Sequence, residues 1–246
     1  MSSAPDLISR ALRHERAIVA GGVALLAALS WWLIARGAGV GHAGGMGGLH
    51  PPPLAALVLM WWLMMTAMML PSAAPAILLY ARVREQRKVM EAIAQSWVFL
   101  AGYLGVWLVF SIAAASMQRL LTGPSMALDN RAADGALLIT AGVYQLSPLK
   151  SACLRQCRSP AAFLSRHWRP GWDGAARLGF LHGAYCVGCC WLLMALLFVG
   201  GVMNLLWVVA LTLIVAVEKL VPHGPFLGRA AGAALVAWGL MRIAAY

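Results

Sequence analysis

The chain has 246 residues, of which 62% are hydrophobic and only 11% are charged, and its formal net charge at pH 7 is +11. Soluble globular proteins carry roughly 25% charged residues, so this composition excludes an ordinary soluble protein and predicts an all-α, polytopic membrane helix bundle that forms a single membrane domain, residues 1–246. The positive charges lie between apolar stretches, without a basic groove that also carries aromatic residues, and nucleic-acid binding is therefore not expected.

About seven apolar stretches approach or exceed the roughly 20 residues that a helix needs to cross the hydrocarbon core of a bilayer. The fourth and sixth stretches are short and the second is long, so six membrane-spanning helices are the alternative if one segment is re-entrant. The predicted spans are residues 17–35, 54–80, 95–116, 135–148, 178–199, 202–217 and 226–245.

Lysine and arginine gather in three segments that alternate along the chain with segments poor in basic residues. These are the N-terminal tail, residues 82–88 and residues 150–177. By the positive-inside rule, the N-terminus and a basic loop at 150–177 are expected in the cytoplasm, and the loop at 36–53 is expected outside. The sequence thus predicts a multi-pass protein of the bacterial inner (cytoplasmic) membrane.

The predicted external loop 36–53 is rich in glycine and carries His42, Met46 and His50 at spacings of four residues. Imidazole and thioether groups are soft metal ligands, and glycine leaves the backbone free to wrap around an ion. A flexible linker that happens to contain these residues is the alternative interpretation. The position of the loop directly before a methionine-rich span favours metal capture.

Five methionines form two adjacent rows on the second predicted span, with a spacing of four residues along each row. Thioethers stay neutral in an apolar setting and are soft donors suited to Cu(I). Methionine also fills irregular gaps in helix cores, so packing alone is the alternative. Pro71 and Pro75 predict a kink or an opened turn just beyond these rows. The methionines are Met60, Met64, Met65, Met68 and Met69.

The fifth predicted span contains a histidine and three cysteines at positions i, i+4, i+7 and i+8, which share one face of a helix. Their side chains are soft metal ligands, and polar ligands inside a membrane usually mark a functional site. Cysteine is also a small residue that is commonly buried, so plain core packing is the alternative. The four residues are His182, Cys186, Cys189 and Cys190.

Two further pairs of residues are weaker candidates for a functional role. Cys153 and Cys157 lie four residues apart in the basic connection, where a metal-transfer site and reduced spectator thiols are equally good interpretations. Glu218 and Lys219 end the sixth predicted span, where an ion pair at the membrane interface accounts for both.

Several motifs in a fixed order resemble the DUF2182 family of predicted metal-binding integral membrane proteins. The resemblance runs from about residue 54 to 239 and implies metal binding, with copper handling as the suspected theme. The His- and Gly-rich loop is not part of the pattern. The motifs are WLMMTAMMLP at 62–71, YQLSPLKSACLRQCRSP at 144–160, HGAYCVGCCW at 182–191, GGVMNLLW at 200–207, and the pair Glu218-Lys219.

The leading hypothesis is a membrane protein that handles Cu(I) in transport, in storage or in delivery to a membrane cuproenzyme, with a copper chaperone as a further partner. Methionines on one helix would face cysteines on another. The first alternative is a membrane thiol oxidoreductase that uses Cys186 and Cys189 with a quinone. The second is a metal-free accessory subunit of a respiratory or photosynthetic complex. No phosphate-binding loop, nucleophile triad or pair of carboxylates placed for hydrolysis is present, so a hydrolase is not expected.

Overall fold

The computed structural model describes residues 4–37, 52–83, 89–121 and 130–244, and the regular structure in these ranges is entirely helical. This confirms the all-α prediction. The helices are α1 (Ala4–Ala35), α2 (Leu54–Val83), α3 (Val89–Leu121), α4 (Arg131–Gln145), α5 (Pro148–Arg158), α6 (Pro160–His167), α7 (Gly171–Ala195), α8 (Leu197–Gly200), α9 (Leu205–Leu220) and α10 (Gly224–Ala244).

Five helical segments are long and apolar enough to cross a membrane, judged by length and composition. They are Ala17–Ala35 of α1, Leu54–Val83, Met90–Leu120, Gly171–Gly200 and Gly224–Ala244. Helices α4 and α9, with 15 and 16 residues, are shorter than the roughly 20 residues that a perpendicular span requires. The count of about seven spans, and the orientation that follows from it, stay predictions.

The basic connection 150–177 differs from a simple loop. Most of α5, all of α6 and the first turns of α7 occupy it. Ser147 caps α5, because its side chain accepts a hydrogen bond from the backbone N–H of Lys150, and Pro148 fits the first helical turn, where no N–H is needed. These short helices bring side chains of the basic segment against the bundle.

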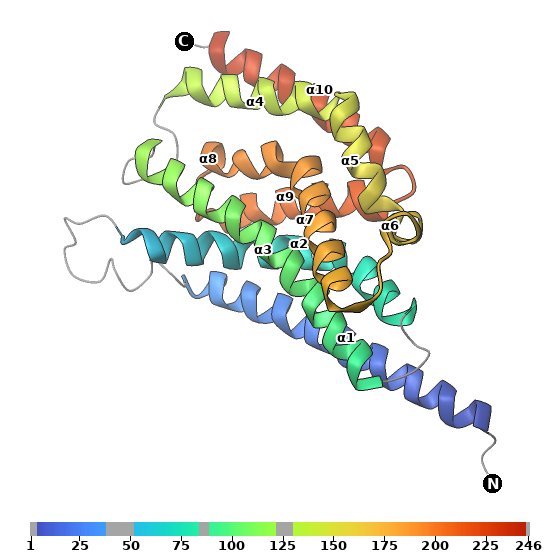
Figure 1. The fold of residues 1–246 in the computed structure, drawn as a ribbon. Coiled ribbons are helices and arrows are strands. Elements are labelled where there is room, and N and C mark those ends of the chain that lie inside the picture. The colour runs from blue at the N-terminus through green and yellow to red at the C-terminus, as the bar shows by residue number, and fades with distance from the viewer. Residues whose placement is uncertain (1–3, 38–51, 84–88, 122–129, 245–246) are drawn as a thin grey trace.

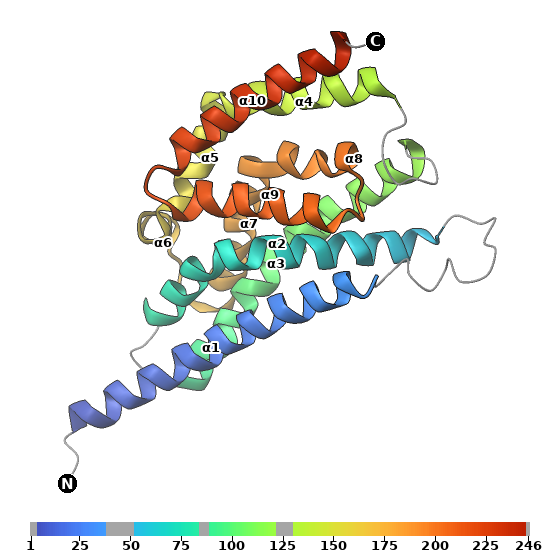
Figure 2. The same ribbon diagram turned by 180° about the vertical axis from the view of Figure 1, so that it is seen from behind.

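Helix α2 lies at the centre of the bundle. It contacts α1, α3, α6 and α9, and it is apolar on all sides, as expected for a helix that is surrounded. Helix α1 runs beside α2, α7 crosses α3, and α4 pairs with α10 along the edge farthest from α1 (Figures 1 and 2). The core therefore gathers between α2, α3, α7 and α9, which is where the sulfur-containing side chains lie.

Glycines allow α3 and α7 to cross at very short range. A Cβ added to Gly179 of α7 would lie 1.9 Å from the carbonyl oxygen of Phe99, and one added to Gly102 of α3 would lie 2.6 Å from that of Ala176. Small residues at such crossings let helix backbones pack directly in membrane proteins. This crossing fixes the position of α7 and therefore the position of its cysteines relative to α2 and α3.

Substitution of Gly179 by alanine is expected to lower the free energy of unfolding by about 1–3 kcal/mol, because the methyl group must push α7 away from α3. The midpoint of thermal unfolding in detergent measures the effect. Gly105→Ala on α3 is the matched control, since an added Cβ there meets nothing within 4 Å and alanine is the better helix former. Equal midpoints for the two variants would contradict the close crossing.

Candidate metal centre

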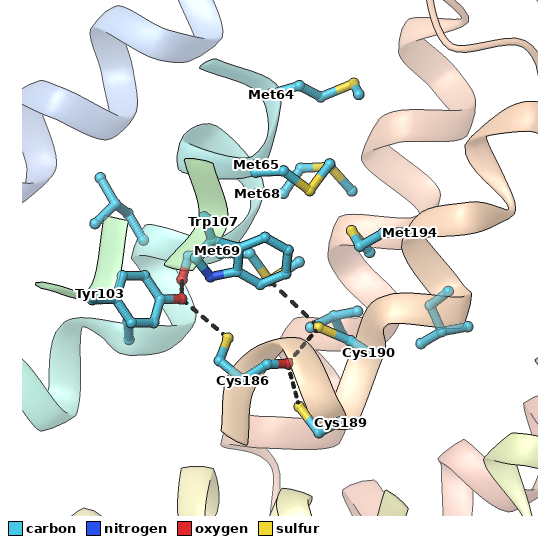
Figure 3. Packing of buried hydrophobic residues seen from close by; sticks show 14 of the residues in the cluster. Met64, Met65, Met68, Met69, Tyr103, Trp107, Cys186, Cys189, Cys190 and Met194 are labelled. Atoms are coloured by element: carbon cyan, nitrogen blue, oxygen red, sulfur yellow. Dashed lines mark hydrogen bonds between the residues drawn. The ribbon is translucent and has the colours of Figure 1, made fainter. Parts of the chain in front are cut away.

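The predicted methionine rows are buried inside the bundle. None of their five side chains is more than 3% exposed. Figure 3 shows four of them pointing from α2 toward α7, with Met64 farthest from the cysteines and Met69 nearest to them. The four are Met64, Met65, Met68 and Met69.

Pro71 opens the hydrogen-bond ladder of α2 next to Met69. Proline has no N–H, so the carbonyl of Ala67 loses its partner within the helix. The indole N–H of Trp31 on α1 donates to that carbonyl instead, at 3.1 Å. The carbonyl of Met69 accepts from the hydroxyl of Tyr103 at 3.5 Å. Neighbouring helices thus satisfy backbone carbonyls of α2 beside Pro71, in a helix that continues from Leu54 to Val83.

The three cysteines of α7 are each 1% exposed. The thiols of Cys189 and Cys190 donate to the backbone carbonyl of Cys186, at 3.1 and 3.0 Å. These bonds to the preceding turn satisfy both thiols inside the helix. All five cysteines of the chain are free, so no disulfide joins the pair Cys186 and Cys189.

The methionine helix and the cysteine helix meet at a direct sulfur contact and are also bridged by Tyr103 of α3, whose hydroxyl contacts Cys186 and the carbonyl of Met69 (Figure 3). Cys190 Sγ lies 3.9 Å from Met69 Sδ, and Cys186 Sγ lies 3.1 Å from the hydroxyl of Tyr103 on α3. The side chain of Met194, one turn beyond Cys190, is fully buried. The structure therefore places a thiol and a thioether in contact, with further methionine sulfurs stacked above them along α2.

Lys219 of α9 reaches into this sulfur cluster, which the sequence interpretation did not anticipate. Its ammonium lies 3.0 Å from Cys186 Sγ, 3.3 Å from Ser72 Oγ and 3.8 Å from Met69 Sδ, and the residue is only 6% exposed. No carboxylate lies within ion-pair distance of it in the part of the chain that the structure describes. A charged residue at the end of an apolar span is the sequence signal for such a site.

The expected interfacial ion pair of Glu218 with Lys219 is wrong, because the two residues are buried and point to different partners. Glu218 Oε2 lies 2.5 Å from Lys150 Nζ, and both side chains are 3% exposed. Gln145 donates to the other carboxylate oxygen at 2.5 Å and accepts a hydrogen bond from Lys150. Arg158 donates to the backbone carbonyl of Glu218. The carboxylate of Glu218 is therefore bound by side chains of α4 and α5 and does not pair with Lys219.

His182 lies one turn before Cys186 and is 2% exposed. Its ring is surrounded by aromatic rings, with centroid distances of 6.0 Å to Phe99, 5.8 Å to Tyr103 and 5.2 Å to Phe163. Its Nδ1 has no hydrogen-bond partner among the described residues. A buried ring nitrogen without a partner is costly unless a ligand uses it.

Helix α5 brings a second pair of cysteines to the same place. A Cβ added to Gly188 of α7 would lie 2.9 Å from Cys153 Sγ, so Cys153 packs directly against the backbone between the α7 cysteines. Hydrogen bonds to Cys186 and Cys189, together with burial, raise the pKa of Cys157 well above its usual value. Burial also raises the pKa of Cys153. All five thiols of the chain therefore gather where α5 meets α7.

Comparison with models of known protein families gives a match over most of the chain. The family model PpoB2, described as a copper chaperone, matches residues 58–242. The chain belongs to the PpoB2 copper chaperone family. No curated protein and no solved structure matches the chain.

The residues matched to the PpoB2 family include the methionine rows, the cysteines of α5 and α7, and Lys219. They nearly coincide with the range of the DUF2182 resemblance, which itself stays a prediction. His42, Met46 and His50 lie before the PpoB2 match and outside the residues that the structure describes. Their role as ligands stays a prediction.

The donor set suits the ion that the PpoB2 family name implies. Thiols and thioethers select Cu(I), and His182 adds an imidazole nitrogen without a partner. In the described residues, no group of three His, Cys, Asp or Glu side chains is close enough to hold a metal ion. Cysteine and methionine sulfur atoms are in contact at Cys190 and Met69.

Proposed function

We propose that the chain binds Cu(I) as cargo inside a membrane helix bundle and delivers it to a membrane cuproenzyme. The observation that carries the proposal is the buried contact between Cys190 Sγ and Met69 Sδ, with Cys186 on the adjacent turn of α7. These three residues would be the first ligands of the ion. The remaining methionines of α2, Cys189 and His182 would complete or extend the site.

The burial of the cluster supports handling of a monovalent soft ion. Cu(I) exchanges readily between thiolate and thioether ligands, and methionine supplies such ligands without placing further charge in an apolar interior. The rows on α2 give the ion sulfur atoms at intervals of one helical turn. Their direction, away from the cysteines along α2, suits movement of the ion through the bundle.

A location in the bacterial cytoplasmic membrane, crossed several times, is part of this proposal. Five long apolar helical segments and exposed apolar side chains on α10, such as Phe226 and Met241, support it. Basic residues concentrated in and after α5 support a cytoplasmic position for that end of the bundle.

The thiol oxidoreductase alternative gains no support from the geometry. Cys186 and Cys189 are 1% exposed, and the thiol of Cys189 is bonded to the backbone of α7. Thiol–disulfide exchange requires access of the partner to one sulfur atom, which this depth in the bundle opposes.

Elemental analysis of detergent-purified protein tests the proposal. Wild-type protein made under copper-replete, reducing conditions is expected to contain close to one copper per chain. The double variant Cys186→Ser with Cys190→Ser is expected to lose roughly nine-tenths of this copper, because hydroxyl groups are poor ligands for Cu(I). The serine at 190 can keep the hydrogen bond to the carbonyl of residue 186, so the fold should survive.

Met69→Leu is also expected to lower the copper content. Met241→Leu, on the exposed face of α10, is its matched control and should keep the wild-type copper content. Size-exclusion profiles and unfolding midpoints verify that each variant is folded. Full copper content in the double cysteine variant would contradict the assigned ligands. Wild-type protein free of copper would instead favour the oxidoreductase or the metal-free accessory subunit.

A further inference from the structure

Cys153 and Cys157 differ from the other three cysteines in their exposure. The cysteines of α7 are buried, whereas both thiols of α5 belong to residues of intermediate exposure. They lie one helical turn apart on α5, a short helix outside the five segments that can span a membrane. These thiols therefore lie between the buried cluster and the surface.

Their contacts reach the buried cluster directly. Cys153 Sγ lies where a side chain on Gly188 would have to be, and interaction with Cys186 and Cys189 raises the pKa of Cys157. The hydroxyl of Tyr144 on α4 donates to the carbonyl of Gly188, which holds this part of α7 against α4. Sulfur-containing side chains thus extend from Met69, through the α7 cysteines, to α5.

We propose that Cys153 and Cys157 form a second, surface-accessible copper station, which exchanges Cu(I) with Cys186 and Cys189 and so connects the buried site to a soluble donor or acceptor. This inference rests on the proposed function. In each exchange a Cu–S bond to one station forms as a Cu–S bond to the other breaks, and copper remains Cu(I). The proton of the incoming thiol passes to the outgoing thiolate.

The surface beside this pair selects the charge of the exchange partner. A hollow of about 400 Å³ is lined by Arg155, Gln156, Ser159, Ala162 and Arg166, on α5 and α6. Its two guanidinium groups attract an anionic molecule. A partner that carries Cu(I) on an anionic chelating group is therefore favoured at this end of the bundle.

Transfer of copper to bathocuproine disulfonate, an anionic Cu(I) chelator, tests the proposal with the full chain in detergent. The double variant Cys153→Ser with Cys157→Ser is expected to keep its bound copper but to release it roughly tenfold more slowly than wild type. Ser151→Ala, at an exposed position on the same helix, is the matched control and should release copper at the wild-type rate.

A second measurement uses wild-type protein and needs no substitution. Saturating Cu(I) is expected to protect Cys153 and Cys157 from a membrane-impermeant alkylating reagent, read by peptide mass spectrometry. Unchanged release by the double variant, unchanged alkylation with copper, or complete loss of copper from the double variant would each overturn the second station. Wild-type protein that binds no copper would overturn the proposed function as well. Elemental analysis detects this outcome before any transfer is measured.

Discussion

Glu218→Leu is expected to lower the free energy of unfolding by about 3–5 kcal/mol, the usual cost of removing one partner of a buried ion pair. The ammonium of Lys150 would then remain 3% exposed with Gln145 as its remaining partner. For a chain of this size the midpoint of thermal unfolding should fall by about 10 °C. Midpoints must be compared at one scan rate, because unfolding of such proteins is often irreversible.

The double variant Lys150→Met with Glu218→Leu is the control for this prediction. Buried ion pairs replaced by apolar residues of similar volume are often as stable as the original pair, so the double variant should recover most of the lost stability. A double variant as unstable as Glu218→Leu alone would show that the pair does more than satisfy its own charges, and would contradict this account.

Lys219→Leu is expected to raise the affinity for Cu(I) roughly tenfold or more, about 1.4 kcal/mol. The ammonium lies 3.0 Å from Cys186 Sγ and 3.8 Å from Met69 Sδ, where it would repel a cation bound to these sulfur atoms. Two unit charges at about 4 Å repel each other by roughly 4 kcal/mol at an effective dielectric constant of 20. Competition with a chelator of known affinity for Cu(I) measures the change.

The same substitution in a Cys186→Ser background separates charge from folding effects. If Lys219 acts on the ion at Cys186, the gain in affinity should largely disappear in this background, as a double-mutant cycle detects. Unchanged or weaker binding by Lys219→Leu alone would mean that the ammonium does not oppose the ion.

Sequence patterns predicted the features of this molecule that are set within a single helix. The apolar stretches indicated helices, and the all-α fold is confirmed. The spacing of Cys186, Cys189 and Cys190 predicted a shared position on one helix, and the structure buries all three. The proline at position 71 predicted an interrupted ladder, and Trp31 supplies the missing donor. That these residues bind copper stays a prediction.

Features that depend on packing between distant helices were not predictable. The sequence pairs Glu218 with its neighbour Lys219, yet the register of α9 against α5 and α7 sends the two side chains to opposite partners. The approach of α5 to α7 likewise depends on the missing side chain of Gly188. No local pattern encodes either distance, because each is set by helices far apart along the chain.

At the proposed copper site, the ammonium of Lys219 would also discriminate between ions by valence. The Coulomb repulsion from Lys219 doubles when a monovalent ion is replaced by a divalent one. The neighbouring Met69 thioether carries no charge that would offset this difference, and the carboxylate of Glu218 is engaged by Lys150. The repulsion from Lys219 on zinc, which shares the preference of copper for cysteine, would therefore be twice that on Cu(I). Helix α9, which contributes no sulfur ligand to the cluster, would in this way set which ions the cysteines and methionines hold.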